Sequence, residues 1–150
     1  MDVIIHCSDS KWGNAIALDG WHAQRGFNNG QGIHIGYHYV ILNGQLSPTK
    51  YHKFFDGSIE TGRPLDDDGQ FEKDEMAAAT LGKNDCVQIC LIGESGSFTL
   101  AQLKNCAILL RELKVQYSGI KVFQHSDFDK VNRQYCAGLT KLQMETFNTL

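Results

Sequence analysis

The sequence lacks long hydrophobic runs and an excess of charge of either sign. No stretch approaches the roughly 18 consecutive apolar residues that indicate a membrane-spanning helix, so we expect no membrane insertion. The 14 basic and 17 acidic side chains are interspersed and give a formal net charge of -3. A chain with this balance offers no cationic face for nucleic acid and no basic amphipathic helix for a membrane surface. We therefore expect no nucleic-acid partner.

The N-terminus also lacks the features of a signal peptide. Met1 and Asp2 lead into a short apolar run, with no basic region before it and no small-residue cleavage site after it. We therefore expect a buried strand at this position, and synthesis of the protein in the cytoplasm.

Cysteine is present, but in a number and distribution that do not suit a disulfide framework. The five cysteines are an odd number in dissimilar surroundings, which indicates a reducing compartment. Cys136 stands in a polar, glycine-bearing segment. The other four are expected to be small buried hydrophobic residues, because they occur in strand-like apolar runs or on a helix face: Cys7, Cys86, Cys90 and Cys106.

The composition is sufficient for one buried core. A chain of 150 residues with 42% hydrophobic residues is short for two independent domains, so residues 1–150 are expected to form one domain. Apolar runs predict strands over 2–7, 35–42, 86–92 and 121–124. Helical periodicity predicts helices over 14–25, from 99 to about 117, and from 140 onward. This alternation predicts an α/β fold in which helices flank a central mixed β-sheet.

Local signals indicate where helices begin and where the chain turns. Two pairs have the spacing of capping boxes at helix N-termini: Thr99 with Gln102, and Thr140 with Gln143. The last helix is expected to bury Leu142, Phe147 and Leu150. Asn43-Gly44 and Asp56-Gly57 are typical of hairpin turns, and residues 45–53 between them are expected to form an insertion.

Two histidines occupy similar positions at the ends of predicted strands. His6 and His125 each follow an apolar run and precede a serine with an aspartate close behind. Cys136 lies on the segment that leaves His125, so folding can bring all three together. Two imidazoles and a thiolate would hold zinc and leave its fourth position open, as in a catalytic site. HExxH and paired CxxC motifs are absent, so spacing alone favours structural, hydrogen-bonded histidines over a metal site.

A series of short segments, taken in order, carries a family resemblance. The segments are 5–8 (IHCS), 21–27 (WHAQRGF), 35–41 (IGYHYVI), 56–65 (DGSIETGRPL), 81–84 (LGKN), 88–93 (QICLIG), 98–102 (FTLAQ), 125–127 (HSD) and 136–138 (CAG). Together they span nearly the whole chain. In this order the chain resembles the zinc-dependent N-acetylmuramoyl-L-alanine amidases, specifically the phage lysozyme and peptidoglycan-recognition group.

The resemblance implies a reaction and a set of site residues. It implies that His6, His125 and Cys136 bind Zn²⁺ and that Tyr37 lies beside the water held by the metal. The substrate it implies is bacterial peptidoglycan, cut at the amide between the lactyl group of N-acetylmuramic acid and L-alanine. We expect a phage endolysin that acts as a monomeric zinc amidase domain without a separate wall-binding domain. It would be made in the host cytoplasm and reach the wall by another route, commonly a holin in such systems.

The chain departs from that family pattern in three places. Gln134 stands where members often have a lysine that stabilises the oxyanion; Arg133 is the first candidate to replace its charge, and Lys130 the second. Residues 77–80 lack a histidine that faces the groove in related enzymes. Residues 45–53 and 66–75 are expanded, and Lys50 to Lys53 could form a lip for an anionic peptide or merely a solvated loop.

Two other functions compete with the amidase. A module on the same fold could bind peptidoglycan or a protein without hydrolysis, because the lysine at position 134 and the groove histidine are missing. A cysteine peptidase could use Cys90 or Cys136 as nucleophile and His125 as base. The remaining histidines and Trp21 are assigned to structure rather than chemistry: His22 to a helix, His38 to a strand, and His34 and His52 to loops.

Overall fold

The computed structural model describes residues 1–150 except 29–30, 66–67, 69, 77–79 and 81. Two features noted in the sequence fall partly outside these described residues. They are residues 77–79, in the segment where related enzymes carry a histidine that faces the groove, and part of the expanded segment 66–75. The strands are β1 (Val3–Cys7), β2 (Tyr39–Ser47), β3 (Lys50–Thr61), β4 (Val87–Leu91) and β5 (Val122–Gln124). The helices are α1 (Ala15–Gln24), α2 (Leu100–Gln116) and α3 (Lys141–Thr149), with a 3-10 turn η1 (His125–Asp127).

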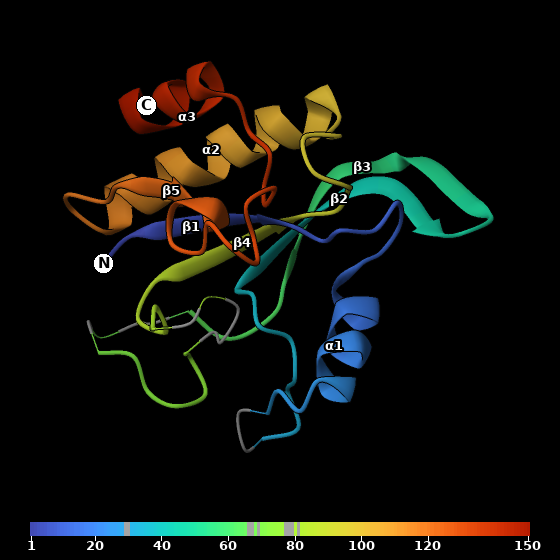
Figure 1. The fold of residues 1–150 in the computed structure, drawn as a ribbon, viewed down its shortest axis with the longest axis horizontal. Coiled ribbons are helices and arrows are strands. Elements are labelled where there is room, and N and C mark those ends of the chain that lie inside the picture. Colours follow the sequence, from blue (N-terminus) through green and yellow to red (C-terminus); the bar gives the residue numbers. More distant parts are fainter. Residues whose placement is uncertain (29–30, 66–67, 69, 77–79, 81) are drawn as a thin grey trace.

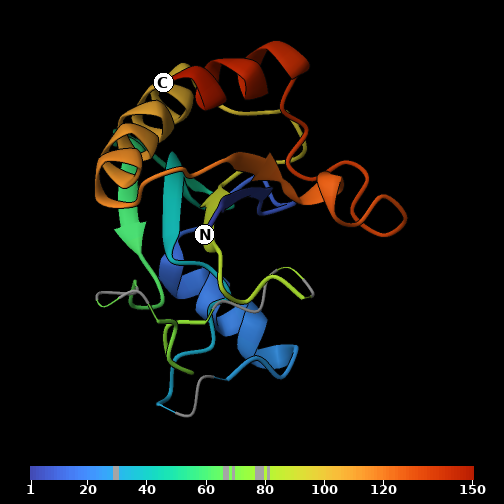
Figure 2. The ribbon, with the colours of Figure 1, turned by 90° about the vertical axis from the view of Figure 1, so that its left-hand side faces the viewer.

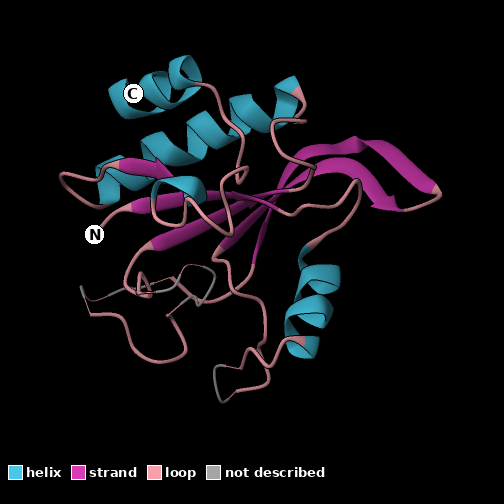
Figure 3. Cartoon of the chain, viewed as in Figure 1, coloured by secondary structure: helices cyan, strands magenta, loops and turns pink. Residues whose placement is uncertain are grey.

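The five strands form one mixed sheet in the order β3-β2-β4-β1-β5. β4 pairs in parallel with β1 and β2, β1 pairs in parallel with β5, and only the β2–β3 pair is antiparallel. Helices α2 and α3 cover one face of the sheet and α1 lies on the other (Figures 1 and 2). This arrangement of layers confirms the predicted α/β fold (Figure 3).

The two central strands are buried along their whole length. All residues of β1 and of β4 are buried, as expected for parallel strands covered on both faces. Because side chains alternate along a strand, Ile5 and Cys7 pack into the core under α2, whereas His6 points to the opposite face. On that face Leu18 of α1 packs against a second cluster that contains Cys90.

The predicted helix starts are confirmed. The reciprocal hydrogen bonds of both capping boxes are present at the starts of α2 and α3. In α3 Phe147 is buried and Leu150 packs against the core, but the prediction for Leu142 is wrong, because its side chain is 72% exposed. Residues five apart on a helix lie on different sides, whereas Met144 and Phe147 are three apart and share the face that meets the core.

The predicted turns at Asn43-Gly44 and Asp56-Gly57 are wrong. Both pairs lie inside the long β2–β3 hairpin, and the chain turns instead at residues 48–49. Gly44 (φ 89°) and Gly57 (φ 83°) have left-handed backbone conformations next to shifts in strand register. Both glycines lie in β-bulges. A β-bulge, like a hairpin turn, needs a residue that can adopt a positive φ, and glycine does so without strain. Residues 45–53, predicted to be an insertion, are the outer part of this hairpin.

The burial predicted for Cys7, Cys86, Cys90 and Cys106 is confirmed. All five cysteines are buried and none forms a disulfide. Within the described residues, no helix is long and apolar enough to cross a bilayer.

Candidate metal centre

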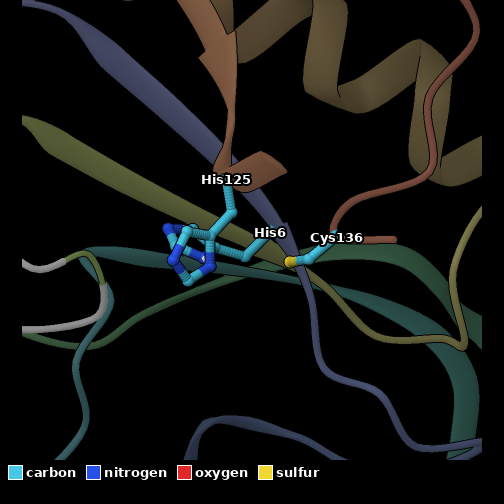
Figure 4. Close-up of side chains that lie close together, drawn as sticks. All are labelled: His6, His125 and Cys136. Carbon is cyan, nitrogen blue, oxygen red and sulfur yellow. Dashed lines mark hydrogen bonds between the residues drawn. The ribbon is translucent and has the colours of Figure 1, made fainter. Parts of the chain in front are cut away.

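The structure brings His6, His125 and Cys136 together. His6 lies near the end of β1, His125 begins η1 directly after β5, and Cys136 lies on the segment before α3. Because β1 and β5 are parallel neighbours, their carboxyl ends meet at the same edge of the sheet. The ligand atoms of the three side chains lie within 4.8 Å of one another, and the two Nδ1 atoms are 3.1 Å apart (Figure 4).

A glutamine on the adjacent strand sets which nitrogen of His6 is free. His6 Nε2 lies 2.6 Å from Gln88 Oε1, and the other end of that amide donates to the Lys83 carbonyl at 2.9 Å. The amide is thereby oriented with its oxygen toward the imidazole, so His6 Nε2–H is the donor. Thr80 donates to the same oxygen at 3.0 Å. His6 therefore turns the lone pair of Nδ1 toward His125.

Both histidines are held in the neutral form that metal binding requires. Burial, and then the neighbouring His125, lower the pKa of His6 to about 3. Burial, followed by the positive charge of Arg133, also lowers the pKa of His125. Neutral imidazoles have a lone pair available for a metal ion without first losing a proton.

The environment of Cys136 favours a thiol unless a cation is present. Its hydrogen bond with the Cys7 side chain, together with burial, raises the pKa of the Cys136 thiol. The Cys7 backbone N–H donates to Cys136 Sγ at 3.2 Å, which suits a sulfur that carries negative charge. Burial likewise raises the pKa of Cys90. Neither cysteine has the lowered pKa of a nucleophilic thiolate, which counts against the cysteine-peptidase alternative.

The donor set fits zinc. Two nitrogens and one sulfur are ligands that Zn²⁺ prefers, and tetrahedral ligation at about 2.0–2.1 Å places two nitrogens roughly 3.3 Å apart. The observed Nδ1 separation of 3.1 Å is close to that spacing. The same distance also fits a hydrogen bond from His125 Nδ1–H to the lone pair of His6 Nδ1, and a bound metal ion would take the place of that proton.

A cavity of about 280 Å³ opens beside the three residues. Its wall includes Tyr37, His22 and Phe27, and its charged lining residues are Asp9, Arg25 and Arg133. An open cavity with polar groups at its floor allows a substrate to reach the atoms that would surround a metal.

Tyr37, which the resemblance implied to lie beside the metal-bound water, packs beside His6. Its ring centroid is 5.1 Å from that of His6, and the side chain is buried. Burial, together with the nearby cysteines, raises the pKa of Tyr37 well above its usual value. The phenol therefore keeps its proton and can act as a hydrogen-bond donor.

The loop before Cys136 brings Arg133, rather than Gln134, to the cavity. All three basic or amide side chains are exposed, but Arg133 lines the cavity, whereas Gln134 and Lys130 are not among the lining residues that the structure describes. The Arg133 backbone N–H donates to the Asp129 carbonyl at 3.1 Å, which helps to hold this position. The charge of Arg133 reaches both histidines, because it lowers the pKa of each.

The other histidines have structural partners or lie away from the cavity. His22 lines the cavity, but its Nδ1 accepts a hydrogen bond from the Gly36 N–H at 2.7 Å. His38 is held between the Glu75 carbonyl, 2.6 Å from Nε2, and the Gln88 N–H, which donates to Nδ1 at 2.9 Å. His38 therefore supports the strand that carries Gln88. His34 and His52 do not line the cavity.

Two contributors to the site were missed in the sequence. Gln88 is fully buried beside His6, and Thr80 contacts the same amide. A polar residue inside the most apolar strand was the signal that could have identified Gln88, because a buried amide needs partners. Lys50 and Lys53, considered as a substrate lip, lie on the hairpin and not at this cavity.

No protein-family model matches the chain, but individual proteins do. The endolysin of Klebsiella phage KP32 is 28% identical over 136 residues, which cover 83% of this chain and 74% of that protein. Among solved structures, the N-acetylmuramoyl-L-alanine amidase LysC from Clostridium intestinale URNW is similar with a TM-score of 0.70 at 20% identity, over 98% of this chain and 81% of that one. The endolysin amidase LysCS of the same organism has a TM-score of 0.67 at 21% identity, over 91% and 74% of the two chains.

A further structure, of the protein AmpD, has a TM-score of 0.52 at 13% identity over 97% of this chain and 83% of its own. The fold inferred from the ordered sequence segments is therefore confirmed by solved structures. The phage protein found by sequence similarity is named an endolysin, the kind of protein that the resemblance implied.

Proposed function

We propose that this chain, which has the fold of N-acetylmuramoyl-L-alanine amidases and resembles a phage endolysin, is a zinc-dependent peptidoglycan hydrolase. It cleaves the amide between the lactyl group of N-acetylmuramic acid and L-alanine. The observation that carries the proposal is the meeting of His6, His125 and Cys136 at an open cavity, with ligand atoms within 4.8 Å of one another.

The three side chains are the proposed zinc ligands. A zinc ion bound there supplies a Lewis acid that polarises the scissile carbonyl and activates water at neutral pH. His6 offers Nδ1, because Gln88 occupies its Nε2–H. A thiolate at Cys136 makes the site less positive than three imidazoles would.

Tyr37 and Arg133 are the proposed residues that act on the reacting groups. The phenol of Tyr37 donates a hydrogen bond to the water or to the oxyanion of the tetrahedral intermediate. The guanidinium of Arg133 supplies the positive charge that lysine gives at position 134 in related enzymes, because it lines the cavity and Gln134 does not. Both groups stabilise negative charge that develops as the amide is attacked.

The proposed place of action follows from the substrate. The enzyme works as one amidase domain, is made in the host cytoplasm, and acts on the wall after release. Its proposed partner is the muropeptide portion of peptidoglycan.

The function is tested with purified zinc-loaded protein and isolated bacterial sacculi. We expect solubilisation of the sacculi with release of new L-alanine amino termini and no new reducing sugar ends, and we expect chelation to stop it. Lysis that persists after chelation but is stopped by a thiol-alkylating reagent would contradict zinc catalysis. Binding to sacculi without release of amino termini would favour the recognition module.

Replacing Arg133 by alanine is expected to lower the turnover number on sacculi about 100- to 1,000-fold, the range for loss of one oxyanion-stabilising group. Gln134→Ala is the matched control and should stay near the parent, because Gln134 is exposed outside the cavity. Steady-state rates on a soluble muropeptide measure both. If Gln134→Ala has the larger effect, the assignment of these two neighbours is reversed.

Replacing Gln88 by leucine is expected to weaken zinc binding about 10- to 100-fold. Leucine has a similar volume but leaves the buried His6 Nε2–H without its acceptor, so the imidazole loses its preferred tautomer and orientation. Gln88→Glu restores an acceptor and should recover most of the affinity. Competition with a chromophoric chelator measures zinc affinity directly, and equal affinity in the leucine variant would remove Gln88 from the support of the site.

A further inference from the structure

The outer part of the β2–β3 hairpin exposes aromatic side chains. We call residues Lys50 to Phe55 of β3 the hairpin tip. Phe54 is 87% exposed, Tyr51 55% and Phe55 38%. The hairpin extends beyond the layers formed by the helices (Figure 1), and no residue of the tip lines the cavity. Exposed clusters of large apolar side chains on a soluble domain commonly mark a binding surface.

The strand register explains why these side chains protrude. Gln45 pairs with Tyr51 and Asn43 with Asp56, so one residue of β2 faces four residues of β3 between these pairs. The surplus on β3 bulges outward and carries Phe54 and Phe55. A side chain at Gly44 would come within 2.8 Å of the Tyr51 ring, so glycine leaves room for that ring against β2.

The rings support one another. The centroids of Phe54 and Phe55 are 5.5 Å apart with nearly perpendicular planes, and those of His52 and Phe55 are 6.0 Å apart in the same geometry. Edge-to-face contacts of this kind hold aromatic side chains in place before a ligand arrives. The tip therefore presents an ordered set of ring faces.

The tip is also cationic in a chain whose net charge is -3. Lys50 and Lys53 are exposed, and within the described residues neither forms an ion pair. The next acidic residue, Asp56, accepts a hydrogen bond from the Thr99 hydroxyl at 2.6 Å and is held against the body of the protein. Lysines on an edge strand disfavour pairing with a strand of another protein. The exposed rings and the two positive charges together match a ligand that is anionic and has ring-shaped apolar faces.

We propose that the hairpin tip is a second binding surface for polymeric peptidoglycan, separate from the cavity. The inference rests on the proposed function. The aromatic rings would pack on the apolar faces of the sugar rings of a glycan strand, while Lys50 and Lys53 pair with carboxylates of its stem peptides. A polymer held at two places stays near the enzyme between cleavage events, because the second contact raises its local concentration.

The test compares polymer and monomer as substrates. The variants are Phe54→Ser with Phe55→Ser, and separately Lys50→Glu with Lys53→Glu. Each should lower binding to sacculi in a pelleting assay, and hydrolysis of sacculi below saturation, about tenfold. Activity on a soluble monomeric muropeptide should be unchanged. Leu142→Ser on α3 is the matched control, because Leu142 is 72% exposed and far from the hairpin in sequence.

The possible outcomes separate this inference from the proposed function. Equal losses on polymer and monomer, or no loss of sacculus binding with the melting temperature preserved, would overturn the second surface. Loss of binding to phosphatidylglycerol vesicles with sacculus binding intact would also overturn it and identify a lipid surface instead. If the unmodified protein cleaves neither substrate, the proposed hydrolysis fails, while the pelleting assay still tests the hairpin tip.

Discussion

Replacing Cys136 by alanine is expected to remove bound zinc and to lower peptidoglycan hydrolysis by about a thousandfold or more. The proposed site has three protein ligands, so the loss of one leaves two imidazoles that cannot retain the ion at micromolar zinc. Without the ion, water at the cavity has no Lewis acid to activate it. Zinc content by atomic absorption and the release of L-alanine amino termini measure the two parts of this expectation.

His6→Ala and His125→Ala should give the same result as Cys136→Ala. The matched control is Cys106→Ala, because Cys106 is also a buried cysteine but lies on α2 away from the cavity. It should keep one zinc per chain and near-parent activity. A Cys136→Ala protein that folds, keeps stoichiometric zinc and retains full activity would show that Cys136 is not a ligand.

Replacing Tyr37 by phenylalanine is expected to lower the turnover number about 100- to 1,000-fold while zinc content stays near one per chain. The substitution removes only the hydroxyl, so the ring that packs against His6 and His22 remains. What is lost is a donor that stays protonated, because burial holds the Tyr37 pKa well above its usual value. A missing oxyanion donor costs roughly this factor in other hydrolases.

Two further measurements identify the cause of any loss at Tyr37. Tyr39→Phe is the control, because Tyr39 packs on the opposite face of the sheet and is not part of the cavity wall. It should leave turnover unchanged. Full activity of the Tyr37→Phe protein would remove this residue from the mechanism, and loss of zinc from it would make its role structural.

The secondary structure was largely predictable because its signals are local. The capping boxes at Thr99 and Thr140, and the unbroken apolar run of β4, depend on side chains within a few residues of one another. The hairpin was harder, because a glycine with positive φ serves a turn and a β-bulge equally well. Only the pairing of β2 with β3 distinguished the two at Gly44 and Gly57.

The three candidate ligands were predictable from the sequence, but their surroundings were not. His6 and His125 end strands, and parallel neighbours bring such ends to one edge of a sheet, so their meeting could be anticipated. Gln88 could not be assigned to His6, because their contact depends on the register between β1 and β4. For the same reason the resemblance put Gln134 at the position of the family's lysine and could offer Arg133 only as a first substitute, whereas the fold of the loop brings Arg133 to the cavity.

The sequence by itself determined the layer architecture, the helix starts and the three candidate ligands. Apolar periodicity, helix caps and strand ends each depend only on residues that are close together in the chain. Only the tertiary structure decided which imidazole nitrogen is free, which basic side chain faces the cavity, and where the aromatic hairpin tip projects. The contacts that build the site join residues as many as 129 positions apart, as between Cys7 and Cys136. Such contacts are set by packing and register, which no local pattern specifies.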